Sequence, residues 1–372
     1  MYGHGAQPGY GASPNYNYNA PMPPNGMRGN GPPTSYHMMS GPTGPPAYQG
    51  HMVHANPQGG VMNGRDMRYE YSSMTGKRKA LLIGINYAGT SSALRGCWND
   101  VHNMARFIQH QGGYHPDDMV ILTDEPTHNM RSLPTRENIC QAMHWLVSGA
   151  QPGDALFFHY SGHGGQTRAV ENDEEDGYNE TILPLDYQST GQMPDDELHA
   201  RLVRPLPVGC RLTALFDSCH SGTALDLPYV YATSGNIKET NITMNVGKGL
   251  LGAAMEYARG DVVGMVSGLF NTVKSATTNR SAAEYTRQMR SSGADVVMLS
   301  GCKDSQTSAD AMEAGRATGA MSWAFISVLS QWPQLSYVQL LNATRDLLAA
   351  KYSQKPQLSA SHPIDMNLLF VI

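Results

Sequence analysis

Two short stretches of the sequence combine residue types that can perform covalent chemistry. The apolar run 212–216 ends in Asp-Ser-Cys-His-Ser-Gly, which contains Cys219. The run 155–160 ends in Ser-Gly-His-Gly-Gly, which contains His163. A cysteine attacks as a thiolate, and a nearby histidine can accept its proton. These residues therefore predict nucleophilic catalysis by Cys219 with His163 as the general base.

His220 is the alternative base, but adjacent residues at a strand end point to opposite sides, so His220 should miss the thiol. Glycines flank His163 and allow close approach of a substrate. The backbone amides of Gly164 and Cys219 are candidate donors to a developing oxyanion. Either motif alone would favour an inert core cysteine, and the presence of both argues against that interpretation.

The elements that must position these residues follow from the apolar pattern. Strands are predicted within 79–89, 118–124, 153–165, 211–219 and 294–302, with a further candidate at 366–372, and helices within 98–113, 135–150, 319–332 and 336–352. This alternation predicts an α/β fold whose mostly parallel central sheet has helices on both faces. Parallel strands end at one edge, where such folds carry their sites, so His163 and Cys219 should meet there.

Composition divides the chain near residue 75. Residues 1–75 are rich in Gly, Pro, Asn, Gln, Tyr and Met and poor in aliphatic residues. Such a segment buries too little apolar surface to offset its backbone entropy, so it is predicted to be disordered. A plain flexible tail and a regulatory pro-segment are both compatible with this composition.

Bulk properties exclude several classes of protein. The net charge of −5 without a long basic block argues against a nucleic-acid partner. No apolar run has the length of a membrane span, and the N-terminal residues lack the pattern of a secretory signal. Five cysteines without paired spacing fit a reducing compartment. We therefore expect a cytoplasmic protein, with the nucleus as an additional compartment, and no membrane partner.

The stretches HYSGHGGQ (159–166) and DSCHSGTALDLPY (217–229) together resemble the metacaspases, and the resemblance extends from about Lys79 to Ile372. The leader and the short linker indicate type I. The resemblance implies a caspase-like three-layer sandwich and a dyad of Cys219 and His163 without a third acid. It also implies a zymogen, active as a monomer, with a catalytic p20-like region at 76–235, a linker at 236–292 and a p10-like region at 293–372.

Acidic residues near the predicted dyad indicate the substrate. Asp217 precedes Cys219 by two residues and shares its face of the strand, while Asp100 follows the first strand. Paired carboxylates attract Arg and Lys side chains. The resemblance likewise implies peptide substrates cleaved after Arg or Lys, in a pocket of Cys97, Asp100, Ser161 and Asp217. The alternative is that Asp217 caps a helix or forms a structural salt bridge.

Candidate metal ligands lie elsewhere. The acidic run 169–180 fails as an EF-hand because its first and twelfth positions are Asn172 and Leu183. Asp195 and Asp196 suit either calcium or a helix N-terminus. The resemblance implies a Ca²⁺ site of Asp195, Asp196, Asp226 and Asn179. Asn179 stands where the family usually has an acid, which removes one negative charge and predicts weaker binding.

The segment 231–293 contains the expected site of self-cleavage. Lys274 precedes small residues in a polar run, combining basic specificity with an exposed backbone. Arg280, Lys238 and Lys248 are the next candidates, and an uncut surface connection is the alternative. The resemblance also favours a lysine matching Lys274.

Other classes of protein account for the motifs less well. An α/β-hydrolase would need a Gly-x-Ser-x-Gly elbow, which the cysteine motif lacks. A zinc site of His159, His163 and Cys219 lacks a convincing ligand set. The opposing functional class is a non-enzymatic interaction protein that uses the leader to associate with aggregates. The leading prediction is a calcium-dependent cysteine endopeptidase with a role in stress response, cell death or protein quality control.

Overall fold

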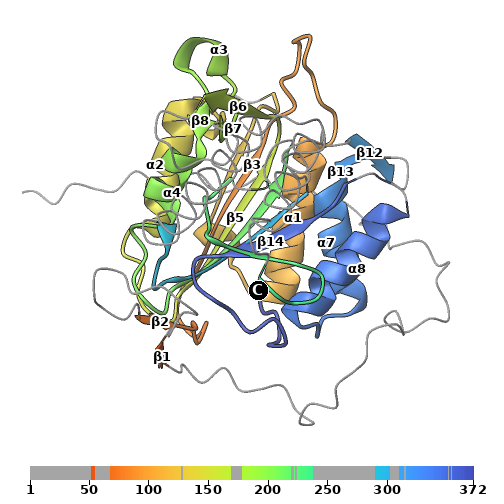
Figure 1. Ribbon diagram of the computed structural model, residues 1–372. Coiled ribbons are helices and arrows are strands. Elements are labelled where there is room, and N and C mark those ends of the chain that lie inside the picture. Colours follow the sequence, from red (N-terminus) through yellow and green to blue (C-terminus); the bar gives the residue numbers. More distant parts are fainter. Residues whose placement is uncertain are drawn as a thin grey trace, which may run out of the picture.

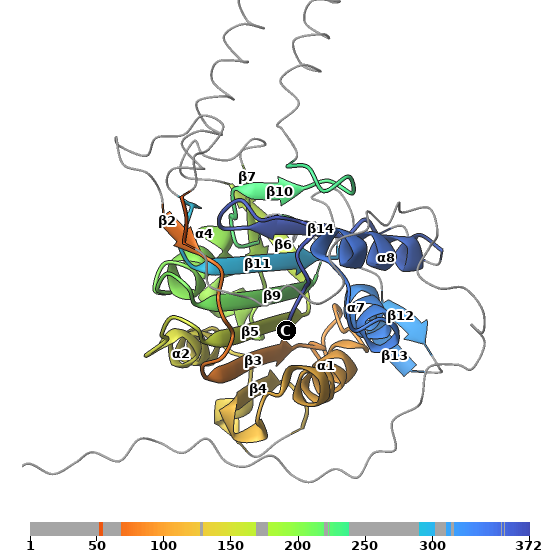
Figure 2. The same cartoon turned by 90° about the horizontal axis from the view of Figure 1, so that it is seen from below.

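The computed structural model describes residues 52–54, 68–126, 129–168, 178–218, 222, 224–237, 290–301, 310–313, 316–350, 352 and 354–372, and within them the largest sheet has seven strands (Figures 1 and 2). The strand order is β10 (Tyr229–Tyr231), β14 (Gln357–Ala360), β11 (Asp295–Ser300), β9 (Arg211–Asp217), β5 (Ala155–Ser161), β3 (Arg78–Gly84) and β4 (Met119–Thr123). From β11 to β4 neighbouring strands are parallel, whereas β14 is antiparallel to β11 and β10. The predicted mostly parallel α/β sheet is confirmed.

Helices cover both faces of this sheet, which gives the three layers of a caspase-like sandwich (Figure 1). One face carries α1 (Cys97–Gly112), α7 (Ala320–Gln331) and α8 (Tyr337–Ala349), and the other carries α2 (Arg136–Val147) and α4 (Asp195–Leu202). The Thr135 side chain caps the N-terminus of α2, because it accepts from the Asn138 amide.

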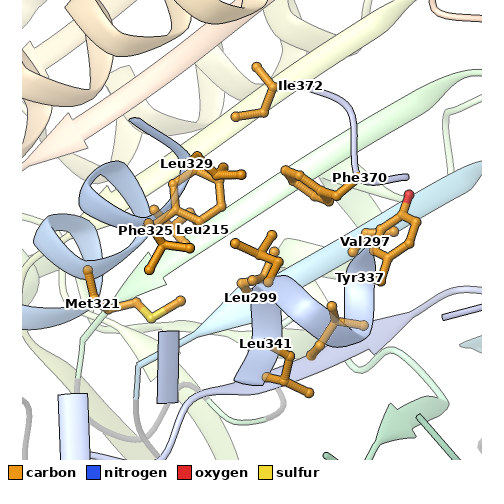
Figure 3. Close-up of a cluster of buried hydrophobic side chains, with 14 of the residues drawn as sticks. Leu215, Val297, Leu299, Met321, Phe325, Leu329, Tyr337, Leu341, Phe370 and Ile372 are labelled. Carbon is orange, nitrogen blue, oxygen red and sulfur yellow. The ribbon is translucent and has the colours of Figure 1, made fainter. Parts of the chain in front are cut away.

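The larger apolar core lies between the sheet and the helices α1, α7 and α8. Figure 3 shows Phe325 and Leu329 of α7 beside Leu215 of β9, with Tyr337 of α8 and Phe370 close by. These side chains are buried, so the face of the sheet that packs α7 and α8 is dry. The residues after the linker therefore complete the same core as the residues before it.

Smaller elements surround the sheet. A three-stranded sheet contains β6 (Gly164–Arg168), β7 (Tyr178–Ile182) and β8 (Met193–Pro194). Two further antiparallel pairs are β1 (Met52–His54) with β2 (Arg68–Glu70) and β12 (Asp310–Glu313) with β13 (Arg316–Gly319). The short helices are α3 (Tyr187–Thr190), Pro116–Asp118 and Met130–Ser132. No helix among the described residues is long and apolar enough to cross a membrane.

The packed part of the chain begins before the boundary expected at residue 75. Tyr69 is buried and stacks on His362 with ring centroids 3.9 Å apart. Ser72 is buried, and its amide donates to Asp295 Oδ2 at 3.1 Å. The expected disorder is therefore wrong for residues 68–75, because an aromatic side chain and a backbone donor tie them to the sheet. The rest of the leader, apart from residues 52–54, lies outside the described residues.

The C-terminal strand predicted at 366–372 is also wrong. These residues form a turn and an isolated bridge between Ser336 and Leu369. Phe370 and Ile372 are nevertheless buried in the larger core. The apolar run thus reflects burial, and the strand that pairs with β11 is β14, at 357–360.

Candidate active site

The strands that precede the two predicted catalytic motifs, β5 and β9, are neighbours in the sheet. In this parallel pair Ser161 lies opposite Asp217. His163 follows Ser161 by two positions, and in the sequence Cys219 follows Asp217 by two positions. Cys219 and His220 lie outside the described residues, whereas Gly164, the other predicted oxyanion donor, begins β6 opposite Ile182.

The imidazole of His163 has a defined hydrogen-bond partner. Its Nε2 lies 2.7 Å from the carbonyl oxygen of Ser92. A carbonyl oxygen only accepts hydrogen bonds, so Nε2 carries the proton and Nδ1 is the basic nitrogen of the neutral ring. This tautomer leaves Nδ1 able to take a proton from a thiol.

Tyr87 holds His163 from a second side, and sequence reasoning missed it. Its hydroxyl accepts from the His163 amide at 3.2 Å and donates to the Leu183 carbonyl at 2.6 Å. The Tyr87 and His163 rings have centroids 4.7 Å apart. Tyr87 also has a φ of 50°, which is rare for a residue with a bulky side chain and typical of functional sites. Its place just after β3 was the available signal.

Asp100 and Ser161 form a buried polar group at the same strand ends. The Ser161 hydroxyl donates to Asp100 Oδ2 at 2.7 Å, and Asp100 Oδ1 accepts from the Gly319 amide at 2.8 Å and from the Thr318 hydroxyl. Cys97 lies one turn earlier on α1, where its amide donates to Asn86 Oδ1. Asp100 is only 1% exposed.

Asp217 faces the same point from β9. Its Oδ2 accepts from the amide of Ser322, in the first turn of α7, at 2.6 Å. A Cβ atom on Gly319 would lie 2.2 Å from Asp217 Oδ2 and 2.8 Å from Asp100 Oδ2, so both carboxylates converge on this glycine. The capping role considered for Asp217 is thus present in the structure. Four predicted pocket residues therefore lie in one region, with the start of α7 packed against them.

Burial and the neighbouring Asp217 carboxylate raise the pKa of Asp100 to about 7. Hydrogen bonds from Thr318, Ser161 and Gly319 favour the ionised form but do not overcome these two effects. The Asp100 carboxyl is therefore about half protonated at neutral pH.

His159 serves a different role from His163. Its Nε2 lies 2.9 Å from the Ser322 hydroxyl, and burial lowers its pKa to about 3. A neutral imidazole bound to α7 is part of the packing between sheet and helix. This observation adds no support for a zinc site that includes His159.

The predicted metal ligands come from three separate elements. Asp195 begins α4, where Oδ2 accepts from the Glu180 amide at 2.7 Å and Oδ1 accepts from the Asp196 amide at 2.9 Å. Asn179 of β7 donates through Nδ2 to Asp196 Oδ2 at 2.8 Å. Asp226 follows the cysteine motif with a φ of 48°. We call Asn179, Asp195, Asp196 and Asp226 the acid cluster.

Arg290 lies within this cluster and was not predicted. Its guanidinium pairs with Asp196 Oδ1 and, at 3.1 Å, with Asp226 Oδ2. Within the described part of the chain, no three His, Cys, Asp or Glu side chains are grouped so as to hold a metal ion. An isolated arginine near the end of a linker carries no sequence signal for this contact.

Comparison with known proteins decides the family. Residues 78–228 match the model of the metacaspase, peptidase C14 domain. The chain is 69% identical over 329 residues to Metacaspase-1 of Mycosarcoma maydis, covering 88% of this chain and 81% of that protein. It is 53% identical over 389 residues to Metacaspase-1A of Aspergillus terreus, covering 98% and 94%.

The chain belongs to the metacaspase family. It is therefore a caspase-like cysteine peptidase, and the predicted enzyme class is confirmed. Among solved structures, protein GSU0716 from Geobacter sulfurreducens is similar at 24% identity and a TM-score of 0.48, covering 80% of this chain and 98% of that one.

The described cysteines of this metacaspase are unsuited to attack. Burial raises the pKa of the Cys210 thiol to about 12, and burial also raises the pKa of Cys140. Cys97 is buried at the start of α1. The predicted nucleophile Cys219, the oxyanion amide of that residue and the cleavage site Lys274 all lie outside the described residues.

Proposed function

We propose that this metacaspase is a calcium-dependent endopeptidase that cleaves after Arg or Lys. In this proposal Cys219 is the nucleophile, His163 the general base, and the amides of Gly164 and Cys219 bind the oxyanion. The main support is the convergence of two buried carboxylates, Asp100 and Asp217, where β5 and β9 end, two residues before His163 and Cys219.

Peptide hydrolysis in such a site proceeds by proton transfer and acyl transfer. The Cys219 thiol gives its proton to Nδ1 of His163, and the thiolate attacks the scissile carbonyl carbon. The imidazolium then protonates the leaving amine, and water hydrolyses the thioester with His163 again acting as base. The Ser92 carbonyl holds Nε2–H throughout, so the ring keeps its orientation.

The pocket acids support a preference for a basic side chain. The Asp217 carboxylate raises the pKa of Asp100 by repulsion of like charge, and a bound guanidinium or ammonium would offset that repulsion. A neutral or acidic side chain would leave that repulsion or increase it. Efficient cleavage after Asp is therefore excluded by this proposal, and the pocket residues remain Cys97, Asp100, Ser161 and Asp217.

The acid cluster has the ligand chemistry that calcium prefers, although in the described structure its carboxylates are not grouped as metal ligands and would have to move together around the ion. Its side chains offer oxygen donors, and Asn179 Oδ1 is a buried oxygen without a hydrogen-bond partner among the described residues, with Asn179 only 7% exposed. Asp195, Asp196, Asp226 and Asn179 would hold the ion. When bound, calcium would supply positive charge that fixes the loop carrying Asp226 next to the cysteine motif.

Further parts of the proposal rest on the resemblance and on composition. The enzyme is a zymogen and a monomer in the cytoplasm, with the nucleus as an additional compartment. It processes itself at Lys274 and acts in stress response, cell death or protein quality control. Its partners are protein substrates with Arg or Lys at the cleavage site, with neither nucleic acid nor membrane involved.

Matched fluorogenic peptides that differ only in having Arg, Lys or Asp before the scissile bond test the proposal. We expect hydrolysis of the first two in calcium, none of the third, and loss of activity with a chelator. Cys219→Ala and His163→Ala should each reduce kcat by at least about 10²-fold, and Asp217→Ala should abolish turnover of basic peptides. Equal hydrolysis of the Asp peptide would refute the specificity, and chelator-resistant activity would refute the metal dependence.

A further inference from the structure

The acid cluster contains an internal cation. The guanidinium of Arg290 bridges Asp196 of α4 and Asp226 of the loop after the cysteine motif. Arg290 and Asp226 are each 6% exposed, so their contact is largely shielded from water, whereas the Asp196 side chain is partly exposed. A buried ion pair needs good geometry to offset desolvation, and a bridging guanidinium with two carboxylates provides it.

Arg290 and a divalent ion need the same oxygens. Asp196 gives Oδ1 to Arg290 and Oδ2 to the Asn179 amide, while Asp226 gives Oδ2 to Arg290. Calcium collects six to eight oxygens within a short radius and repels a cation held among them. Asp195, Asp196 and Asp226 carry three negative charges, and the positive charge of Arg290 offsets one of them.

We propose that Arg290 is the residue that sets the cation affinity of the acid cluster, by occupying it as a counter-ion that a bound divalent ion must displace. This inference rests on the calcium site of the proposed function. Asn179 carries no charge, so among the four proposed ligands the negative charge that attracts either cation comes from Asp195, Asp196 and Asp226.

Replacement of the Arg290 guanidinium by a divalent ion would also affect the chain next to Arg290. The residue stands at the end of the linker 236–292, five residues before β11 begins at Asp295. Just after it, the Ser292 amide donates to the Ser361 carbonyl at 3.2 Å. Displacing the guanidinium would loosen the chain at Arg290, so cation binding would weaken the neighbouring contact of Ser292 with Ser361.

Calorimetric titration of Ca²⁺ into the Cys219→Ala chain, which cannot process itself, tests the competition. We expect Arg290→Gln to bind Ca²⁺ at least about tenfold more tightly than the unaltered Arg290 chain, because close buried charge pairs carry coupling of that size. Arg204→Ala is the matched control: it removes an exposed positive charge just beyond α4 and should leave the affinity within about twofold.

Hydrogen exchange on the Cys219→Ala chain needs no substitution at Arg290. Saturating Ca²⁺ should raise the rate of hydrogen exchange at the Ser292 amide. A sodium salt that supplies the same concentration of positive charge should not. Unchanged or weaker Ca²⁺ affinity in Arg290→Gln, or unchanged exchange at Ser292 on saturation, would overturn the role of Arg290 while leaving the calcium site intact. Absence of Ca²⁺ binding in every variant would overturn both this inference and the calcium part of the proposed function.

Discussion

Nε2 of His163 lies 2.7 Å from the carbonyl oxygen of Ser92, and this contact determines which ring nitrogen is basic. A backbone carbonyl cannot be removed by substitution, so a side-chain substitution at Ser92 keeps the acceptor that favours the Nε2–H tautomer of His163. The aromatic side chain that supports the same imidazole can be altered, and it provides the first test.

Tyr87→Phe should lower kcat by about tenfold with little change in KM. The substitution removes the hydroxyl that accepts from the His163 amide and donates to Leu183, while it keeps the ring beside the imidazole. Tyr187→Phe is the matched control, since the Tyr187 ring packs edge-on against Tyr87 with ring centroids 6.3 Å apart. A change confined to thermal stability in Tyr87→Phe would mean that the hydroxyl has no positioning role.

Binding of an Arg peptide to the Cys219→Ala chain should weaken by up to about tenfold between pH 8 and pH 6. The pKa of Asp100 is raised to about 7, so below pH 7 this carboxyl becomes neutral and its attraction for a guanidinium is lost. Calorimetry at three pH values measures this without interference from the nucleophile. Asp100→Asn should bind weakly at all three values, and an affinity in the Cys219→Ala chain that is independent of pH would contradict the pocket role of Asp100.

Asp295→Asn should lower the free energy of unfolding at pH 7 by about 3–5 kcal/mol. Asp295 pairs with Arg211 at 2.9 Å with both side chains fully buried, and Arg211 also donates to the Tyr337 hydroxyl. Burial alone would raise the pKa of Asp295, but Arg211 and His362 lower it to about 2.

The pH dependence gives an independent check on the Arg211–Asp295 pair. Because the folded-state pKa of Asp295 lies below its ordinary value, the pair stabilises the protein above about pH 4 and loses this effect as the pH falls towards 2. Urea unfolding at pH 7 and pH 3 should therefore show a smaller deficit for Asp295→Asn at pH 3. Asp117→Asn, at an exposed acid, should have little effect at either pH.

Addition of calcium to the wild-type chain should yield a fragment that begins at Ser275, while Cys219→Ala stays intact. Lys274 lies in a polar run that suits an extended, bound conformation. N-terminal sequencing identifies the cut. A fragment starting elsewhere would reject Lys274, and cleavage of pure Cys219→Ala would reject self-processing.

Local apolar patterns predicted the parallel part of the sheet and the helices α1, α2, α7 and α8 well, because each of these elements buries a regular face. They did not predict β6, β7 and β8, since Gly164–Arg168 is polar and only partly buried and is held by pairing across the sheet. The pattern in 366–372 was misleading because a buried turn and a buried strand can have the same composition.

The pocket residues were predictable because period-2 geometry relates Asp217 to the cysteine motif along one strand. The donors from Gly319 and Ser322 were not, since Gly319 lies 219 residues after Asp100 and Ser322 lies 105 residues after Asp217. Arg290 acts through contacts that no local pattern encodes, whereas the place of Tyr87 just after β3 was a signal that could have been used.

The order of strands at one side of the sheet has a consequence for the cut enzyme. β10 precedes the linker and β11 and β14 follow it, yet β14 lies between β10 and β11, and β11 lies against β9 (Figure 2). Strands from before and after the linker therefore alternate at this side of the sheet. A single cleavage within 238–289 would leave two polypeptides that can part only by opening the sheet in its middle, so the processed protein should migrate as one species until it is denatured.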